Sequence, residues 1–253
     1  MNQHNIRVAT YNVHFGLDTK AISEVFKKNK NLSQADIIFF QEIEHHHAEA
    51  MPRAEAIAKE LGMHFSYAPA RPVKDLGTHG IATFSRYPLD DNKILKLPKY
   101  NMVFHSYQRI ALISTAVIAG KRVTLCNIHL DSRLNPTQRI AQLDFALQRL
   151  IKNHPGPIIF GGDLNTIPML LAGKMVPVFY ANQFKLIHEH MSDRGFVYSC
   201  EKKRYTMKKG LLRMSLDHIY TNTLPIVSSG VEQKVFASDH KPLWADVEVN
   251  TVL

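Results

Sequence analysis

The chain has 253 residues, of which 45% are hydrophobic and 21% charged, and this is the composition of a globular protein with a buried core. Its net charge of +9 favours polyanionic partners such as nucleic acid, phosphorylated small molecules or anionic lipid, although a charge that only keeps the protein in solution would look the same. The two cysteines, the polar start and the lack of a run of roughly 20 apolar residues argue against a disulfide framework, a signal peptide and a membrane-spanning segment, so we expect a cytoplasmic protein.

The predicted elements alternate between strands and helices. Alternating apolar residues at 6–10 predict a first strand, and apolar residues at helical spacing in 21–29 predict a helix. The short, fully apolar run 37–40 is typical of a strand that is buried on both faces. A second helix is predicted between Pro52, which opens it, and Gly62, which ends it.

The second half of the chain continues this alternation. Asn135 and Pro136 cap a further amphipathic helix, whose apolar stripe runs from Ile140 to Ile151. The pattern is that of a strand-rich α/β protein, and we expect residues 1–253 to form a single domain. The remaining predicted strands are 80–85, 110–118, 122–130, 157–160, 216–221 and 243–249.

Apolar strand-like segments repeatedly end in side chains that can bind a metal ion or a phosphate. Because ligand sites of α/β folds lie beyond the carboxyl ends of strands, these side chains can converge in space. They are Asn12, Gln41, Glu42, His129, Asp163, Asn165, Asp217, Asp239 and His240.

The four carboxylates in this set require a cation if they converge, because repulsion and desolvation oppose their approach. A hard divalent ion relieves this cost. Mg²⁺, which is usually held by one or two carboxylates, water and a substrate phosphate, suits the set best, with Mn²⁺ as the alternative. Zinc suits it less, because the sequence has no cysteine pair and no H-E-x-x-H motif.

Each of these residues also has a simpler interpretation when it is taken alone. Asn12 and Gln41 can be turn formers, His129 a core histidine, Asp163 an ordinary turn residue and Asp217 a surface carboxylate. The joint pattern favours a catalytic interpretation over these separate ones.

The motifs together resemble those of the endonuclease/exonuclease/phosphatase superfamily. The resemblance implies a deoxyribonuclease-like fold, which is a four-layered α/β sandwich with two central, mostly antiparallel β-sheets flanked by helices. It also implies a magnesium-dependent hydrolase that acts on phosphoester bonds. The matching segments occur in family order at 11–12, 41–42, 127–130, 162–165, 216–219 and 238–240.

The resemblance implies a role for each matching residue. Glu42 should be the principal metal carboxylate, with Asn12 beside it and Asp239 contributing to the metal region. Asp163 should orient or deprotonate the attacking water, and Asn165 should hydrogen-bond a phosphoryl oxygen.

Two histidines complete the implied machinery. His240, held by Asp217, should stabilise the charged phosphoryl group or share in proton transfer. His129 should donate to a non-bridging oxygen. The division of acid and base between Asp163 and His240 stays open at this point.

Substrate contacts are predicted from basic residues. Arg109 and Arg139 can meet phosphate, although packing or surface roles fit them equally well. Lys203 belongs to the basic segment 202–209, which can follow a nucleic-acid backbone or form a solvated loop.

The substrate class follows from charge and from one segment. Residues 129–132, with Arg139 downstream, are similar to the 5′-tyrosyl-DNA phosphodiesterase and compact bacterial branches. We therefore expect a monomeric phosphodiesterase on nucleic acid, either a nuclease or a DNA-end phosphodiesterase. The alternatives are a phosphatase or phospholipase acting on inositol phosphates or sphingomyelin-type lipids, and a non-catalytic module that binds polyanions.

Overall fold

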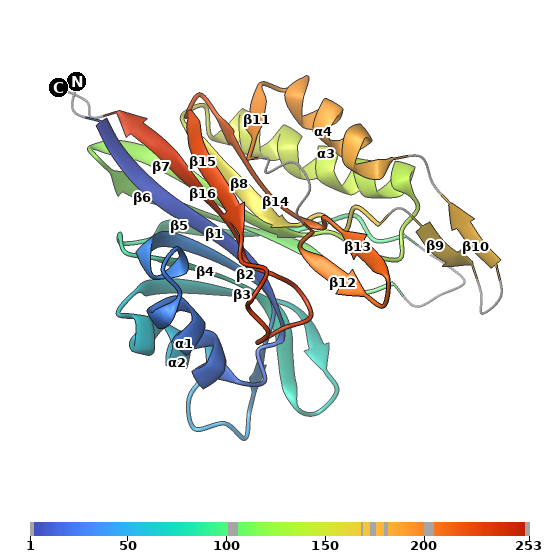
Figure 1. The fold of residues 1–253 in the computed structure, drawn as a ribbon, viewed down its shortest axis with the longest axis horizontal. Coiled ribbons are helices and arrows are strands. Elements are labelled where there is room, and N and C mark those ends of the chain that lie inside the picture. The colour runs from blue at the N-terminus through green and yellow to red at the C-terminus, as the bar shows by residue number, and fades with distance from the viewer. Residues whose placement is uncertain are drawn as a thin grey trace.

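Two six-stranded β-sheets pack face to face, and helices cover the outer face of each (Figure 1). This arrangement confirms the predicted four-layered α/β sandwich. The computed structural model describes residues 3–100, 106–167, 169–172, 176–179, 182–199 and 205–250.

The first sheet has the strand order β15-β16-β1-β2-β4-β3. Only the β1–β2 pair is parallel. Its strands are β1 (Gln3–Phe15), β2 (Ala35–His46), β3 (His64–Val73), β4 (Gly77–Ser85), β15 (Ile226–Val231) and β16 (Leu243–Asn250). The helical segments beside it are α1 (Thr19–Lys28), the short 3₁₀ segment η1 (Leu32–Gln34) and α2 (Arg53–Leu61).

The second sheet has the order β11-β14-β8-β7-β6-β5, with β7–β8 as its parallel pair. Helices α3 (Pro136–Asn153) and α4 (Gln183–Ser192) cover its outer face (Figure 1). Its strands are β5 (Asp90–Lys96), β6 (Ile110–Ile118), β7 (Lys121–His129), β8 (Ile158–Asp163), β11 (Phe196–Tyr198) and β14 (Asp217–Asn222). Two small hairpins pair β9 (Met169–Ala172) with β10 (Val176–Phe179), and β12 (Met207–Lys209) with β13 (Leu212–Met214).

Apolar clusters fill the three spaces between the four layers, and the alternation of side chains along each strand assigns residues to them. In β1, Ile6 and Val8 join the core between the sheets, whereas Ala9 and Tyr11 pack in the core beneath α1 and α2. The third core lies between the second sheet and α3. Each central strand is therefore buried on both faces, which explains its continuous apolar run.

The structure confirms the strands and helices that the sequence predicted and adds others. Four of the added strands, β3, β5, β11 and β15, are the edge strands of the two sheets. An edge strand has one partner and less burial, so its pattern is weak. In β3, Pro69 and Pro72 make the strand still harder to recognise from sequence, because proline is rare inside strands.

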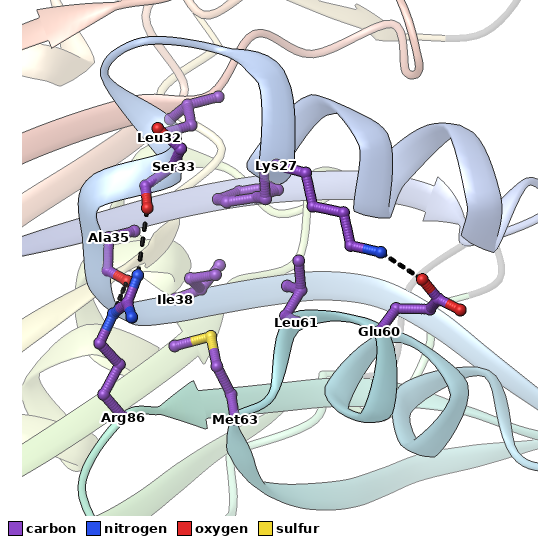
Figure 2. Close-up of a pocket in the computed structure, with 10 residues that line it drawn as sticks. Lys27, Leu32, Ser33, Ala35, Ile38, Glu60, Leu61, Met63 and Arg86 are labelled. Atoms are coloured by element: carbon purple, nitrogen blue, oxygen red, sulfur yellow. Dashed lines mark hydrogen bonds and ion pairs between the residues drawn. The ribbon is translucent and has the colours of Figure 1, made fainter.

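A small cavity of about 190 Å³ lies beneath the first helix pair (Figure 2). Phe26, Leu32 and Ile38 line it, and an ion pair between Lys27 and Glu60 closes one side. These apolar residues belong to the helix-side core, so the cavity opens on the face of the sheet that carries none of the polar strand ends. None of the described helices is long and apolar enough to cross a membrane.

Candidate active site

The polar strand ends converge because they share one face of their strands. In β7, His129 lies four residues beyond Leu125 and therefore on the same face, which is the face between the sheets. The same even spacing links Asp163 to Ile159 in β8 and Asp217 to Ile219 in β14. The inter-sheet core therefore ends in a polar cluster.

The two sheets are joined directly beneath this cluster. Gln41 Nε2 of the first sheet donates to Asn127 Oδ1 of the second over 2.8 Å, and Asn127 Nδ2 donates back to the carbonyls of Phe40 and Ala82. These buried bonds hold the two halves of the site in register, since an unpaired amide in this place would be costly.

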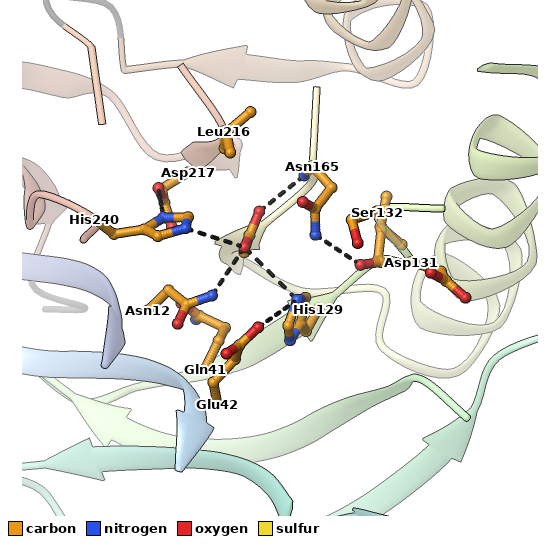
Figure 3. Close-up of polar contacts among 12 residues, drawn as sticks. Asn12, Gln41, Glu42, His129, Asp131, Ser132, Asn165, Leu216, Asp217 and His240 are labelled. Atoms are coloured by element: carbon orange, nitrogen blue, oxygen red, sulfur yellow. Dashed lines mark hydrogen bonds and ion pairs between the residues drawn. The ribbon is translucent and has the colours of Figure 1, made fainter. Parts of the chain in front are cut away.

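A cleft of about 710 Å³ opens at this point. Figure 3 shows Asn12, Glu42, His129, Asn165 and His240 directed toward a common centre. Of the predicted site residues, Asn12, Glu42, Asp163, Asn165, Asp239 and His240 line the cleft.

Asp163 lies at the centre of the site and is 1% exposed. Asn12 Nδ2 donates to its Oδ2 over 3.0 Å, and the backbone N–H of Asn165 donates to its Oδ1 over 2.9 Å. Burial and the nearby charge of Asp217 raise the pKa of Asp163 to about 7, although His240 and these hydrogen bonds oppose the rise. Asp163 is thus tuned to exchange a proton near neutral pH.

His240 lies between two carboxylates. Its Nδ1 is 2.8 Å from Asp217 Oδ2, and its Nε2 is 4.0 Å from Asp163 Oδ2. Burial disfavours the charged ring, but the charge and hydrogen bond of Asp217 outweigh it and raise the pKa of His240 to about 10. The ring is therefore an imidazolium at neutral pH.

His129 faces the same Asp163 oxygen from another side, with its Nε2 3.6 Å from Oδ2 and 3.8 Å from Glu42 Oε1. Its other ring nitrogen, Nδ1, lies 3.0 Å from Arg109 Nη1. Burial, followed by the charge of Arg109, holds the pKa of His129 well below its ordinary value. Two histidines in opposite charge states therefore face one carboxyl group, a pattern typical of acid–base sites.

Left-handed backbone conformations cluster at the site. Glu42 has φ +56° at a bulge between Gln41 and Ile43, and Asn165 has φ +49°. His14, near the mouth of the cleft, has φ +43°. Non-glycine residues adopt this conformation at a cost, so the surrounding fold holds these side chains in place.

The oxygen donors at the mouth of the cleft fit a hard divalent cation. The side chains of Glu42 and Asp239 are 21% and 43% exposed, which leaves room for water ligands. His14 Nδ1 lies 4.0 Å from Glu42 Oε2 and 3.7 Å from Asp239 Oδ1, so the two carboxylates flank one imidazole. With the amide oxygen of Asn12 nearby, this set of oxygen ligands suits Mg²⁺, and it contains no thiolate of the kind that softer metals prefer.

A deeper group, formed by Asp163, Asp217 and His240, also has atoms within 4.8 Å of one another. Within this group, His240 Nδ1 and Asp217 Oδ2 are already paired with each other over 2.8 Å. We therefore interpret the deep group as a hydrogen-bonded relay and the Glu42 region as the candidate metal site.

Sequence reasoning missed His14 and the apolar wall of the cleft. His14 follows Asn12 by two residues at the end of β1, and this position was the available signal. The wall carried no comparable signal, because the β12–β13 hairpin reaches the cleft only through tertiary contacts such as the bridge between Met207 and His240. The wall consists of Ile167, Met207, Leu212, Met214 and Leu216.

The predicted substrate contacts are placed differently from the rest. Arg139 is 1% exposed, and its guanidinium donates to the carbonyls of Asp131, Ser132 and Leu134. These bonds make Arg139 a support for the loop after β7, in place of the predicted phosphate contact. Arg109 lies behind His129, and Lys203 falls outside the described residues.

Comparisons with known proteins agree with this geometry. A sequence model described as the Endonuclease/Exonuclease/phosphatase family matches residues 9–240. None of the curated proteins matches the chain.

Solved structures share the fold at low sequence identity. An endonuclease/exonuclease/phosphatase from Beutenbergia cavernae DSM 12333 is 18% identical with a TM-score of 0.75, over 97% of this chain and 72% of that chain. An endonuclease/exonuclease/phosphatase family protein from Bacteroides thetaiotaomicron is 16% identical with a TM-score of 0.73, over 99% and 100%. TDP2 from Caenorhabditis elegans is 22% identical with a TM-score of 0.65, over 97% and 75%.

Proposed function

Because this chain belongs to the endonuclease/exonuclease/phosphatase family, we propose that it is a divalent-metal-dependent phosphodiesterase that acts on nucleic acid. The observation that carries the proposal is the convergence of Glu42, Asp163 and His240 in one cleft, although they are far apart in sequence. A protein that only bound polyanions would have no need of a carboxyl group tuned to neutral pH beside a charged imidazole.

The residues of the cleft divide the chemistry between them. Asp163 accepts a proton from the attacking water, a role that suits a carboxyl group whose pKa is about 7. His240, held by Asp217, presents its charged ring to the phosphoryl group and donates a proton to the leaving oxygen. Asn165 and His129 supply neutral hydrogen-bond donors for the phosphoryl oxygens.

Glu42, Asn12 and Asp239 would hold the metal ion, which we propose to be Mg²⁺ with Mn²⁺ as a substitute. When bound, the ion neutralises charge on the phosphoryl group in the transition state. The chain's own contribution is to fix these oxygens, through the strained backbone of Glu42 and the bond that Asn12 makes to Asp163.

The walls of the cleft support a nucleic acid as the substrate. Arg133 lines the cleft and also lies 4.9 Å above the ring of Tyr107, and the chain as a whole is basic. The apolar wall, with Leu212 and Met214, offers contacts to a base or to another apolar group on one side of the scissile phosphate. The resemblance of residues 129–132 to the 5′-tyrosyl-DNA phosphodiesterase branch adds 5′-phosphotyrosyl DNA to the substrates worth testing.

The test is hydrolysis of DNA, RNA and 5′-phosphotyrosyl DNA with Mg²⁺, Mn²⁺ or EDTA. We expect metal-dependent turnover that falls by roughly 10²-fold or more in Asp163→Asn. Asp193→Asn, which changes an exposed carboxylate at the end of α4, is the matched control.

Two outcomes would contradict the proposal in different ways. Activity confined to inositol phosphates or sphingomyelin would overturn the substrate and leave the chemistry standing. Binding of nucleic acid without any turnover, unchanged in Asp163→Asn, would identify a non-catalytic binding module.

A further inference from the structure

Arg109 occupies an unusual place behind the site. It lies immediately before β6, which is antiparallel to β7, and so comes beside the end of β7 where His129 lies. Arg109 is 9% exposed, and its Nη1 lies 3.0 Å from His129 Nδ1. Its Nε has no hydrogen-bond partner among the described residues, and the carboxylates of Glu42, Asp131 and Asp163 act on it through charge and not through a hydrogen bond. A buried cation without a contacting anion is costly, so packing alone is a poor reason for its position.

The contact between Arg109 and His129 specifies where the imidazole carries its hydrogen. A guanidinium has five N–H donors and no acceptor, so it bonds to Nδ1 only if that nitrogen has a free lone pair. A neutral imidazole has one N–H and one lone pair, and the hydrogen must then be on Nε2.

His240 shows the opposite arrangement with the same ring. Its Nδ1 faces Asp217 Oδ2. Because a carboxylate can only accept a hydrogen bond, His240 Nδ1 must carry the hydrogen. The two histidines thus receive opposite partners at the same atom, while the Nε2 of each faces Asp163 Oδ2.

We propose that Arg109 is a positioning residue that holds His129 as the tautomer with its hydrogen on Nε2. His129 is then a fixed hydrogen-bond donor toward the phosphoryl oxygen and takes no part in proton transfer, which is left to Asp163 and His240 (Figure 3). The catalytic role of this tautomer rests on the proposed phosphodiesterase function, but the tautomer itself can be tested without measuring turnover.

The direct test is ¹⁵N NMR of the full-length protein labelled in histidine, without metal and with Mg²⁺. The His129 signals are identified by their loss in His129→Ala. We expect a hydrogen on Nε2 and none on Nδ1 in the wild type and in Arg109→Lys, which keeps a donor. In Arg109→Met, Nδ1 should gain a hydrogen. A wild-type Nδ1 that carries a hydrogen would overturn the proposal, even if a variant fails to fold.

A double-mutant cycle tests how Arg109 acts on turnover. Arg109→Met should lower kcat by about 10²-fold, the scale of one lost donor in a preorganised site, with little change in KM. In the His129→Ala background the same change should add no further loss, and Arg109→Lys should recover most of the kcat.

An equal loss in both backgrounds, or a change confined to KM, would mean that Arg109 binds substrate directly and would overturn its positioning role. If no diester is hydrolysed at all, the proposed function fails, and the NMR result alone decides the state of His129.

Discussion

Asp163 is the residue whose ionisation the fold opposes most clearly among the site carboxylates described. It is buried, and Asp217 lies close enough that their combined charge is unfavourable. Asp217 Oδ1 is itself buried without a hydrogen-bond partner among the described residues. The site is therefore strained electrostatically, as expected where function and stability compete.

Because burial and Asp217 disfavour the charged form of Asp163, we predict that this residue makes the free energy of unfolding depend on pH. Asp163→Asn should remove that contribution. The unfolded carboxyl loses its proton near 3.8, whereas the native one keeps it to about 7. Between about pH 4 and pH 6 the native state binds more protons, so this group lowers the free energy of unfolding as the pH rises. His240, whose pKa rises from 6.5 to about 10 on folding, is mostly protonated in both states over this window.

Urea unfolding at pH 4 and at pH 6, with EDTA present, measures the effect. The stability of Asp163→Asn relative to the wild type should increase from pH 4 to pH 6, and Asp193→Asn should show no such trend. If the free energies of unfolding of Asp163→Asn and the wild type change equally between pH 4 and pH 6, the pKa of the buried carboxyl group is not raised in the native state.

At the scale of elements, β8 brings Asp163 into place because two glycines precede it. Gly162 has φ +143°, and a Cβ there would stand 1.9 Å from the carbonyl oxygen of Ile128 in β7. A Cβ on Gly161 would stand 2.8 Å from the ring of Phe39 in the opposite sheet. These contacts allow β8 to approach both its neighbour strand and the facing sheet.

Gly162→Ala is therefore expected to be severe. The loss should lie at the upper end for a single substitution, about 3 kcal/mol in the free energy of unfolding, because backbone must move to admit the methyl group. Gly195→Ala is the matched control: Gly195 has φ +77° but open space around it, so it should cost only about 1 kcal/mol of backbone strain. Equal losses in the two variants would contradict the close approach.

At the scale of the whole molecule, the cleft takes its polar residues from both sheets. Glu42 and Asn12 belong to the first sheet, and Asp163, Asp217 and His129 belong to the second. A ligand that engages both sets stabilises the packing of the sheets, because binding to the native state alone shifts the folding equilibrium.

Mg²⁺ should raise the melting temperature, because it binds to the native arrangement of Glu42, Asn12 and Asp239 and not to the unfolded chain. At a free concentration roughly 100 times its Kd, the gain is about 2.7 kcal/mol, or about 5–10 °C for a chain of this size. Differential scanning fluorimetry with Mg²⁺ against EDTA measures it. Glu42→Gln should abolish most of the shift, and Glu55→Gln, on the exposed side of α2, should retain it. An undiminished shift in Glu42→Gln would place the ion elsewhere.

The sequence alone determined the central strands, α1, α2, α3 and most of the residues that meet in the cleft. Central strands are buried on both faces, so hydrophobic patterning marks them, and polar residues at their ends then stand out. Ordered motifs added the fold, because six short matches in one order restrict the topology far more than periodicity does.

Only the tertiary structure decided the partners of these residues. From sequence, Arg139 was equally open to a phosphate contact and to a packing role, and its bonds to loop carbonyls show the packing role. The apolar wall came from a hairpin whose position no local pattern encodes. The charge states of His129 and His240 depend on which group faces Nδ1, Arg109 or Asp217. Local sequence sets the conformation of a segment, but contact and burial between distant segments set proton affinity, and these exist only after folding.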